Sequence, residues 1–276
     1  MTGWIDAHMH VWQMSRGDYG WLTPDLGPIF RDFTIDDIWA QAESAGVQAV
    51  ILVQAAPSVS ETEFLLELAA SDRRIAGVVG WIGFEAEDWR ASLDALAQNE
   101  MLKGIRPMIG DLDDPEWILS DRFADVFETM ADRSLVLDLH AKPEHLAPCA
   151  QIARRHARLQ LVLDHCGKPP LHTGDIAAWR SAIAELAAHS NVACKVSGLL
   201  TEAGPDPDVD LIRDAMAHVV ACFQTERLLW GSDWPVLELA GSYCDWASFS
   251  RSLLAELTPG SEQAIFNQNA RMIYDL

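Results

Sequence analysis

Short apolar runs alternate along this chain with amphipathic stretches of helical length, and this alternation constrains the fold more than any other feature. The apolar runs are rich in β-branched residues and end at polar or glycine-containing sequence, which is typical of buried strands. They predict strands over residues 4–10, 47–54, 75–81, 102–106, 135–140, 159–165, 192–196 and 228–233. The other stretches predict helices over residues 35–45, 61–70, 88–98, 121–131, 144–155, 176–188, 208–223, 243–257 and 262–274. Strands that alternate with helices in this way form a parallel sheet.

The strand count and the chain length indicate how this sheet is arranged. A closed (β/α)8 barrel needs about 250 residues, and the chain has 276. No glycine- or proline-rich linker divides the sequence, so we expect residues 1–276 to form one α/β domain, a TIM barrel. The longest irregular segments are residues 11–32, 107–120 and 166–175. They follow predicted strands one, four and six, on the face where barrel active sites are built.

Two of the predicted helices begin with recognisable capping signals. Thr34 directly precedes the first helix, where a threonine oxygen can accept a hydrogen bond from the helix backbone. Ser60 and Glu63 match the Ser-x-x-Glu capping box at the start of the second helix. We therefore expect Ser60 to cap that helix.

The charge balance and the cysteine pattern limit the class of protein. The net charge of −21 argues against nucleic acid or an anionic membrane as partner, because both bind basic surfaces. The chain lacks an apolar run long enough to span a membrane and a secretory signal at its start. Its five cysteines include no C-x-x-C pair, so neither a disulfide framework nor a cysteine zinc site is indicated. We expect a cytoplasmic protein that acts on a small molecule.

Two histidines end the first predicted strand. His8 and His10 are two residues apart, so their side chains are expected to project to the same face. Asp6 shares this parity, whereas Ile5 and Ala7 are expected to point toward the surrounding helices. Two imidazoles in this arrangement can bind one divalent ion. The alternative is a pair of hydrogen-bonded histidines in a polar barrel mouth.

Two further strands end in residues that suit hydrolytic chemistry. Strand six ends in Leu-Asp-His-Cys-Gly-Lys-Pro with His165, and strand eight ends in Trp-Gly-Ser-Asp-Trp-Pro with Asp233. A carboxylate near histidines can orient or deprotonate water, although an isolated aspartate is also common in caps and turns. Because the carboxyl ends of parallel strands share one face, both residues are expected beside the histidines of strand one.

Two cationic residues lie at or near strand ends of this acidic protein. Arg106 ends strand four and Lys195 lies in strand seven. Positive charges at a barrel mouth can hold a carbonyl or carboxylate oxygen. The alternative is an ion pair with a carboxylate of the barrel. The candidates for that carboxylate are Asp6, Asp138 and Asp164.

The expected substrate-binding residues include several aromatic side chains. Trp12, Tyr19 and Trp21 lie in or beside the first long loop, and Trp234 follows the strand-eight aspartate. Aromatic faces pack against the C–H faces of a sugar-like ring, and the indole N–H is a hydrogen-bond donor. Gln54 ends strand two and is expected either to bind a substrate hydroxyl or to line the wall.

The motifs of strands one, six and eight, taken together, resemble the amidohydrolase superfamily. The resemblance is to its amidohydrolase-related branch (amidohydrolase 2), which contains sugar-lactone and pyrone hydrolases, and it extends from residue 4 to Arg271. It implies a barrel hydrolase in which the histidines bind metal or substrate and the strand-eight aspartate activates water. The residues that match these roles are His8, His10, His165 and Asp233.

The resemblance does not determine whether the protein binds a metal, because the sequence departs from the usual pattern in strand five. Members that contain metal generally use a strand-five ligand, either a modified lysine or a histidine. Here the strand contains Asp138 and His140 on one face, where the branch usually has an apolar or amide residue near position 140. His140 is therefore either an additional metal ligand or a polar lining residue. Some similar proteins hydrolyse lactones without metal; we expect a divalent ion, with zinc as the first candidate.

These observations lead to one functional hypothesis and two alternatives. We expect a hydrolase that opens a small lactone, an aldonolactone in the first place, with Asp233 as general base and with His165 and Arg106 as further catalytic residues. One alternative is lactone isomerisation or metal-dependent decarboxylation on the same scaffold. The other is a non-catalytic barrel that binds sugar acids. The sequence does not determine the oligomeric state, and a homo-oligomer is one alternative.

Overall fold

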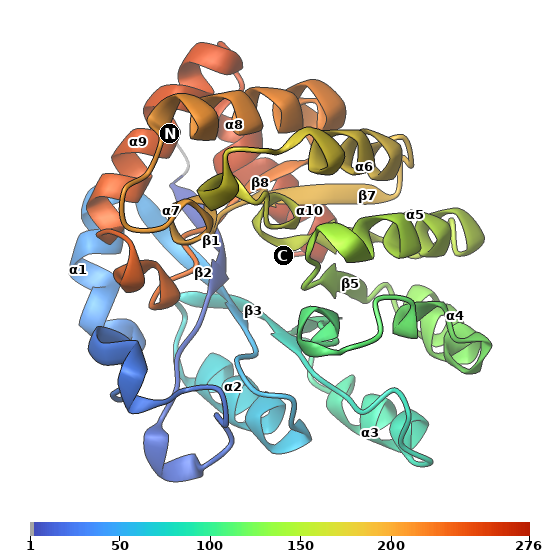
Figure 1. The fold of residues 1–276 in the computed structure, drawn as a ribbon. Coiled ribbons are helices and arrows are strands. Elements are labelled where there is room, and N and C mark those ends of the chain that lie inside the picture. Colours follow the sequence, from blue (N-terminus) through green and yellow to red (C-terminus); the bar gives the residue numbers. More distant parts are fainter. Residues whose placement is uncertain (1–2) are drawn as a thin grey trace.

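The computed structural model describes residues 3–276 and confirms the predicted (β/α)8 barrel (Figure 1). Eight parallel strands pair in the order of the sequence. The barrel closes between the last and the first strand, where the N–H of His10 donates to the carbonyl of Trp234 and the N–H of Asp233 donates to that of His8, both at 2.8 Å. The strands are β1 (Trp4–Met9), β2 (Val47–Val53), β3 (Ile75–Gly80), β4 (Leu102–Ile105), β5 (Val136–Leu139), β6 (Leu161–Leu163), β7 (Val192–Val196) and β8 (Leu228–Trp230).

The helices surround the strands and cover their outer faces, as Figure 1 shows. They are α1 (Ile35–Ala45), α2 (Val59–Ser71), α3 (Trp89–Leu96), α4 (Ala124–Asp132), α5 (Leu146–Arg155), α6 (Ala177–Ala187), α7 (Leu199–Ala203), α8 (Val209–Phe223), α9 (Tyr243–Leu257) and α10 (Asn269–Tyr274). Most lie within three residues of the predicted ranges. The short α7 was not predicted, and a π-helical turn over Ala264–Gln268 leads into α10. Within the described chain, no helix combines the length and apolar character needed to cross a membrane.

The two capping predictions have different outcomes. At α1 the prediction is confirmed, because Thr34 and Asp37 form a reciprocal capping box. At α2 the prediction is wrong: the cap is Ser58, whose Oγ accepts the N–H of Glu61 at 3.0 Å. The helix begins two residues earlier than expected, and its first turn therefore directs Glu61 into the protein, where its side chain is fully buried.

Side chains from the strands fill the interior of the barrel below its mouth. Nearly every strand contributes a small or branched apolar residue to this layer, as barrel interiors require. The members from the strands are Ile5, Ala7, Ile51, Val53, Val79, Val136, Val162, Ala193 and Leu229. The C-terminal helix α10 adds Ala270 and Tyr274 to the same cluster. This helix and the C-terminus lie near the centre of the ring of strands in Figure 1.

The predicted direction of Asp6 is wrong. Ile5 and Ala7, expected to face the helices, pack in the interior cluster instead. Asp6 accepts a hydrogen bond from the hydroxyl of Tyr243 in α9 at 2.9 Å and another from the N–H of Ser232 at 2.9 Å. Its side chain thus joins β1 to the outer helix layer and to the segment after β8, and it does not belong to the barrel mouth.

A bulge in β1 explains why the histidines still face inward although Asp6 does not. Asp6 pairs with Val50 and Met9 pairs with Leu52, so three steps along β1 correspond to two steps along β2. One additional residue in a strand reverses the side-chain alternation beyond it. His8, which lies within the bulge, therefore faces the barrel mouth, and strict alternation from Asp6 would not have placed it there.

Candidate active site

A cavity of about 210 Å³ opens at the carboxyl ends of the strands. Its walls include the side chains of His10, Arg106, His140, His165 and Asp233, which come from the ends of β1, β4, β5, β6 and β8. The other lining residues are Trp21, Ala55, Met108, Asp111, Lys168 and Val236. The cavity therefore lies on the face that the sequence predicted for the site.

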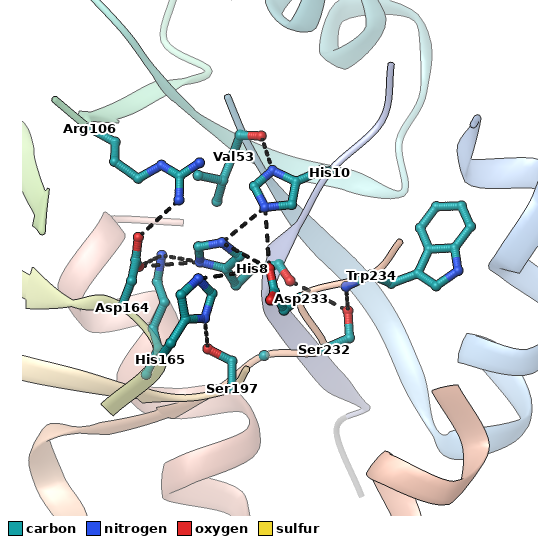
Figure 2. Close-up of polar contacts among 12 residues, drawn as sticks. His8, His10, Val53, Arg106, Asp164, His165, Ser197, Ser232, Asp233 and Trp234 are labelled. Atoms are coloured by element: carbon teal, nitrogen blue, oxygen red, sulfur yellow. Dashed lines mark hydrogen bonds and ion pairs between the residues drawn. The ribbon is translucent and has the colours of Figure 1, made fainter. Parts of the chain in front are cut away.

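Three imidazoles converge on one carboxylate oxygen at the base of this cavity (Figure 2). Asp233 Oδ1 lies 3.4 Å from His10 Nε2, 3.7 Å from His8 Nε2 and 3.8 Å from His165 Nε2. The Nε2 atoms of His8 and His10 are themselves 3.2 Å apart. All four side chains are buried or nearly so. The structure thus brings together the four residues that the strand-end motifs placed in one site.

Unusual backbone conformations bring two of these side chains into the barrel. His165 and Asp233 both adopt left-handed conformations, with φ of 52° and 61°. Residues other than glycine seldom adopt this conformation, and such strain is concentrated at functional sites. At the end of β6 it turns the chain so that the adjacent Asp164 and His165 both face the interior, which strict strand alternation would forbid.

Glycines beside the histidines allow this close packing. A Cβ atom on Gly231 would lie 2.7 Å from the Cβ of His8, and one on Gly198 would lie 2.8 Å from the ring of His165. Gly198 also has a positive φ of 67°. Both positions require glycine, because a side chain there would displace an imidazole of the site.

The second nitrogen of each imidazole has a partner that orients the ring. His10 Nδ1 lies 2.8 Å from the carbonyl of Val53, and His165 Nδ1 lies 2.9 Å from Ser197 Oγ. His8 Nδ1 lies 3.2 Å from Asp164 Oδ1. Burial lowers the pKa of both His8 and His165 well below 6.5, so these rings are neutral. The Nε2 atoms of all three rings face the Asp233 carboxylate, where they are placed to bind a metal ion or to form hydrogen bonds.

The donor set formed by His8, His10 and Asp233 fits a divalent metal ion. Nitrogen and oxygen ligands about 2.0–2.2 Å from a tetrahedral zinc ion lie roughly 3.4 Å from one another. The three separations in this group are 3.2, 3.4 and 3.7 Å. Two imidazoles and a carboxylate are also ligands that zinc prefers. The close approach of these electron-rich atoms is favourable when a cation lies between them.

Arg106 is held at the cavity wall by two partners. Its Nη1 lies 3.3 Å from Asp164 Oδ2, and its Nη2 donates to the carbonyl of Gln54. The side chain is only 3% exposed. Its Nε is buried without a hydrogen-bond partner among the described residues. The geometry thus supplies an oriented positive charge beside the imidazoles, as predicted for this position.

Lys195 was predicted to bind substrate, but the structure places it in the barrel interior and not among the lining residues of the cavity. The side chain is fully buried, and its Nζ lies 2.5 Å from Asp138 Oδ2 and 3.0 Å from Asp164 Oδ1. It also lies 3.2 Å from His8 Nδ1. Of the two alternatives that the sequence left open, the ion pair is correct, because two carboxylates of the barrel interior satisfy the ammonium.

The predicted substrate-binding aromatics are divided between the cavity and the core. Trp21 is 37% exposed and lines the cavity. Trp12 and Trp234, by contrast, are at most 1% exposed and pack against Phe33 beneath the loop after β1. Tyr19 is also buried and packs against Trp12. The structure therefore corrects three of the four expectations, because the rings assemble a small core that supports the loop.

Gln54 and His140 have roles that the sequence left open. Gln54 is fully buried, and its Nε2 donates to the carbonyl of Arg106 at 2.9 Å, so it joins β2 to β4 and does not contact the cavity. His140 lines the cavity. Residues 3–276 contain two groups of side chains whose donor atoms lie close enough together to hold a metal ion, and His140 belongs to neither of them. Burial lowers the pKa of His140 well below 6.5, so it is a neutral polar wall residue. The expectation of a metal ligand at His140 is therefore not met.

Sequence reasoning missed several residues that shape the site. Asp164 was considered only as an ion-pair partner, yet it contacts His8, Arg106 and Lys195. Although burial opposes it, the charges of Lys195 and Arg106 and the hydrogen bond with His8 hold the pKa of Asp164 well below its usual value. The signal available was its position directly before His165 in the motif that ends strand six. Ser197, Glu61, Asp111 and Lys168 were also not assigned to the site.

Comparison with known proteins places the chain among related sequences and structures. The model of the amidohydrolase family matches residues 5–276. Two curated relatives are named L-fucono-1,5-lactonase: one from Burkholderia ambifaria is 39% identical over 99% of this chain and 96% of its own length. The other, from Burkholderia multivorans, is 35% identical with the same coverage. A crystal structure of a Burkholderia multivorans amidohydrolase with bound zinc superposes with a TM-score of 0.93, at 34% identity and over 99% of both chains.

Proposed function

Because the chain belongs to the amidohydrolase family, we propose that it hydrolyses the lactone of a sugar acid. The observation that carries this proposal is the convergence of three imidazoles on the Asp233 carboxylate at the base of a cavity. This arrangement suits the attack of water on an ester carbonyl. The two relatives named as lactonases support an aldonolactone as substrate.

Asp233 acts as the general base in this proposal. Its Oδ1 makes the shortest contacts with all three imidazoles, which leaves Oδ2 to accept a proton. The three histidines fix the orientation of the carboxylate, and no lysine or arginine of the described chain forms an ion pair with it. Asp233 therefore removes the proton from water as the water oxygen attacks the lactone carbonyl.

His8, His10 and Asp233 would hold a divalent ion, with zinc as the proposed metal. Such an ion, when bound, polarises the substrate carbonyl as a Lewis acid. The support for zinc is the fit of the three donor atoms and the zinc in the related Burkholderia multivorans structure. His165 belongs with these residues as a catalytic group, because its Nε2 faces both Asp233 and the cavity.

Arg106 provides the charge that stabilises the carbonyl oxygen as it becomes negative on attack by water, before the bond from the carbonyl carbon to the ring oxygen breaks and the ring oxygen takes up the proton. Its guanidinium lines the cavity, is almost completely buried and is held in one orientation by Asp164 and the Gln54 carbonyl. Fixed positive groups in a site that excludes water stabilise developing negative charge more strongly than groups in bulk solvent do. Trp21 completes the wall and packs against the substrate ring.

Acid release from a panel of aldonolactones tests the proposal directly, because ring opening by water liberates a proton. We expect turnover by the wild-type protein and a fall of roughly 10²–10⁴-fold in the Asp233→Asn variant. Asp113→Asn is the matched control, since Asp113 is an exposed loop residue. The absence of acid release from every lactone would overturn the proposal. Wild-type turnover by Asp233→Asn would remove Asp233 from its role.

The same assay addresses the metal and the alternative reactions. Metal analysis of the purified protein, followed by turnover before and after chelation, tests zinc; we expect the activity to fall on chelation and to return with zinc. Isomerisation releases no acid, and decarboxylation releases carbon dioxide. A binding protein would show a thermal shift with sugar acids and no turnover. The relatives named as lactonases do not favour these alternatives.

A cytoplasmic location belongs to the same proposal. All five cysteines are free, and three of them are buried. A reducing compartment maintains cysteines in this state. The small cavity and the acidic composition support a small-molecule substrate and no nucleic acid partner.

A further inference from the structure

Glu61 carries a buried carboxylate that lies outside the converging site. It belongs to the first turn of α2, and its side chain is fully buried. One oxygen accepts the N–H of Ala55 at 2.9 Å, and the other accepts the N–H of Ala56 at 2.7 Å. Within residues 3–276, no lysine or arginine forms an ion pair with it at contact distance. A buried charge held by backbone groups alone is costly, and it is retained where its contacts have a role.

The opposite ends of the same two peptide groups hold residues of the cavity. The peptide that joins Gln54 to Ala55 donates its N–H to Glu61, and its carbonyl accepts Nη2 of Arg106. The next peptide, from Ala55 to Ala56, also donates its N–H to Glu61. Its carbonyl accepts Nε1 of Trp21 at 2.6 Å. Each peptide is therefore bound at both ends, by the carboxylate on one side and by a cavity residue on the other.

This arrangement couples the orientation of three side chains. A peptide group is planar, so its N–H and C=O cannot turn independently. Hydrogen bonds at both ends of one peptide also polarise and strengthen one another. Rotating either peptide to suit a new position of Arg106 or Trp21 would break a bond to the Glu61 carboxylate.

We infer that Glu61 is a positioning residue for the cavity, which holds Arg106 and Trp21 in place through two consecutive peptide groups. Its catalytic consequence rests on the proposed function, whereas the coupling itself is a property of the fold. Capping of α2 does not account for the carboxylate, because Ser58 Oγ already accepts the N–H of Glu61. Burial raises the pKa of Glu61 to about 7, although the hydrogen bonds from Ala55 and Ala56 and the charge of Arg106 oppose the rise.

Hydrogen exchange tests the coupling without any substrate. Glu61→Gln keeps the shape of the side chain but replaces one acceptor oxygen by an NH₂ group that cannot bind a peptide N–H. We expect faster amide exchange in the segments 17–24 and 54–58, while segments on the opposite side of the barrel are unchanged. Glu63→Gln is the matched control, because Glu63 is exposed and lies two residues further along the same helix. Exchange in Glu61→Gln that matches the control would overturn the inference, whether or not the protein hydrolyses lactones.

Kinetic constants then separate positioning from a purely structural role. For an active lactonase we expect kcat/KM to fall roughly 10-fold or more in Glu61→Gln, the size expected for one lost bond to a charged group. Both kcat, through Arg106, and KM, through Trp21, should change. A structural role alone would lower Tm and leave the kinetic constants of the folded protein at wild-type values.

Trp21→Phe is a second variant, which tests only the connection between Glu61 and Trp21. It keeps an aromatic wall but removes the indole N–H that binds the Ala55 carbonyl. We expect KM to rise with kcat close to wild type, and we expect no further rise in KM when Glu61→Gln is added. Additive changes in KM would show that the two residues act independently and would overturn the inference. A wild-type KM in Trp21→Phe would also overturn the inference, and this result could be obtained even if Glu61→Gln failed to fold.

Discussion

Two groups of buried polar side chains lie close together inside the barrel, and their charges are satisfied in different ways. We call them the upper group, formed by His8, His10, His165 and Asp233, and the lower group, formed by Asp138, Asp164, Lys195 and Tyr274. In the lower group, the Lys195 ammonium contacts both carboxylates, and the Tyr274 hydroxyl donates to Asp138 at 2.8 Å. Burial raises the pKa of Asp138 to about 6, and the attraction of Lys195 limits the rise.

The upper group has no such internal balance. Asp233 contacts imidazoles only, and no lysine or arginine of the described chain forms an ion pair with it. Burial keeps His8 and His165 neutral, so the group offers a negative charge and nitrogen lone pairs to the cavity. The comparison shows that burial and polarity alone do not identify a functional group. The distinguishing feature is whether the chain supplies the countercharge itself.

The largest expected effect comes from removing a member of the upper group. His10→Ala should lower lactone turnover by roughly 10²–10⁴-fold, because it removes one donor of the proposed metal site and a group beside the general base. Zinc content after dialysis should fall in parallel. His172→Ala, at an exposed position in the loop after β6, is the control. Unchanged zinc content with unchanged turnover would mean that the upper group is not the functional one.

The next effect concerns the countercharge of the lower group. Lys195→Met should lower the free energy of unfolding by about 3–5 kcal/mol, because two buried carboxylates lose their shared cation. Denaturant titration of the variant measures this loss. Lys142→Met provides the comparison, since Lys142 is exposed. If Lys195→Met were as stable as that control, the ion pairs of the lower group would not stabilise the fold.

The smallest effect should come from removing the Tyr274 hydroxyl from the lower group. Tyr274→Phe keeps the ring in the interior cluster and removes the hydroxyl that donates to Asp138, so we expect a loss of about 1–2 kcal/mol. Tyr243→Phe, which removes a similar bond to Asp6, should cost about the same. Zinc affinity measured by competition with a chelator should stay at the wild-type value in Tyr274→Phe. A large fall in that affinity would show that the two groups are not independent.

The architecture and the main site residues were accessible from the sequence because they depend on local patterns. Strand and helix periodicities are properties of neighbouring residues, and they predicted the eight strands of the barrel. Parallel strands present their carboxyl ends on one face, so motifs at the ends of β1, β6 and β8 predicted that His8, His165 and Asp233 would meet. No knowledge of packing was needed for that step.

Parity arguments failed where the backbone departs from regular geometry. The bulge in β1 turned Asp6 outward, and the left-handed conformation of His165 brought its ring into the interior beside Asp164. Both departures depend on how a strand is paired and on the turn that follows it. Neither leaves a signal in the spacing of residue types.

The sequence by itself determined the eightfold alternation, the face that carries the site and the residues whose strand ends meet there. Only the tertiary structure decided which charged residues line the cavity and which are paired inside the barrel. Lys195 and Arg106 looked equivalent along the chain, but Lys195 lies among two carboxylates inside the barrel and Arg106 lines the cavity. The physical reason is that the role of a charge depends on its neighbours in space. In a barrel those neighbours come from strands that are distant in sequence, as Lys195 and His8 are.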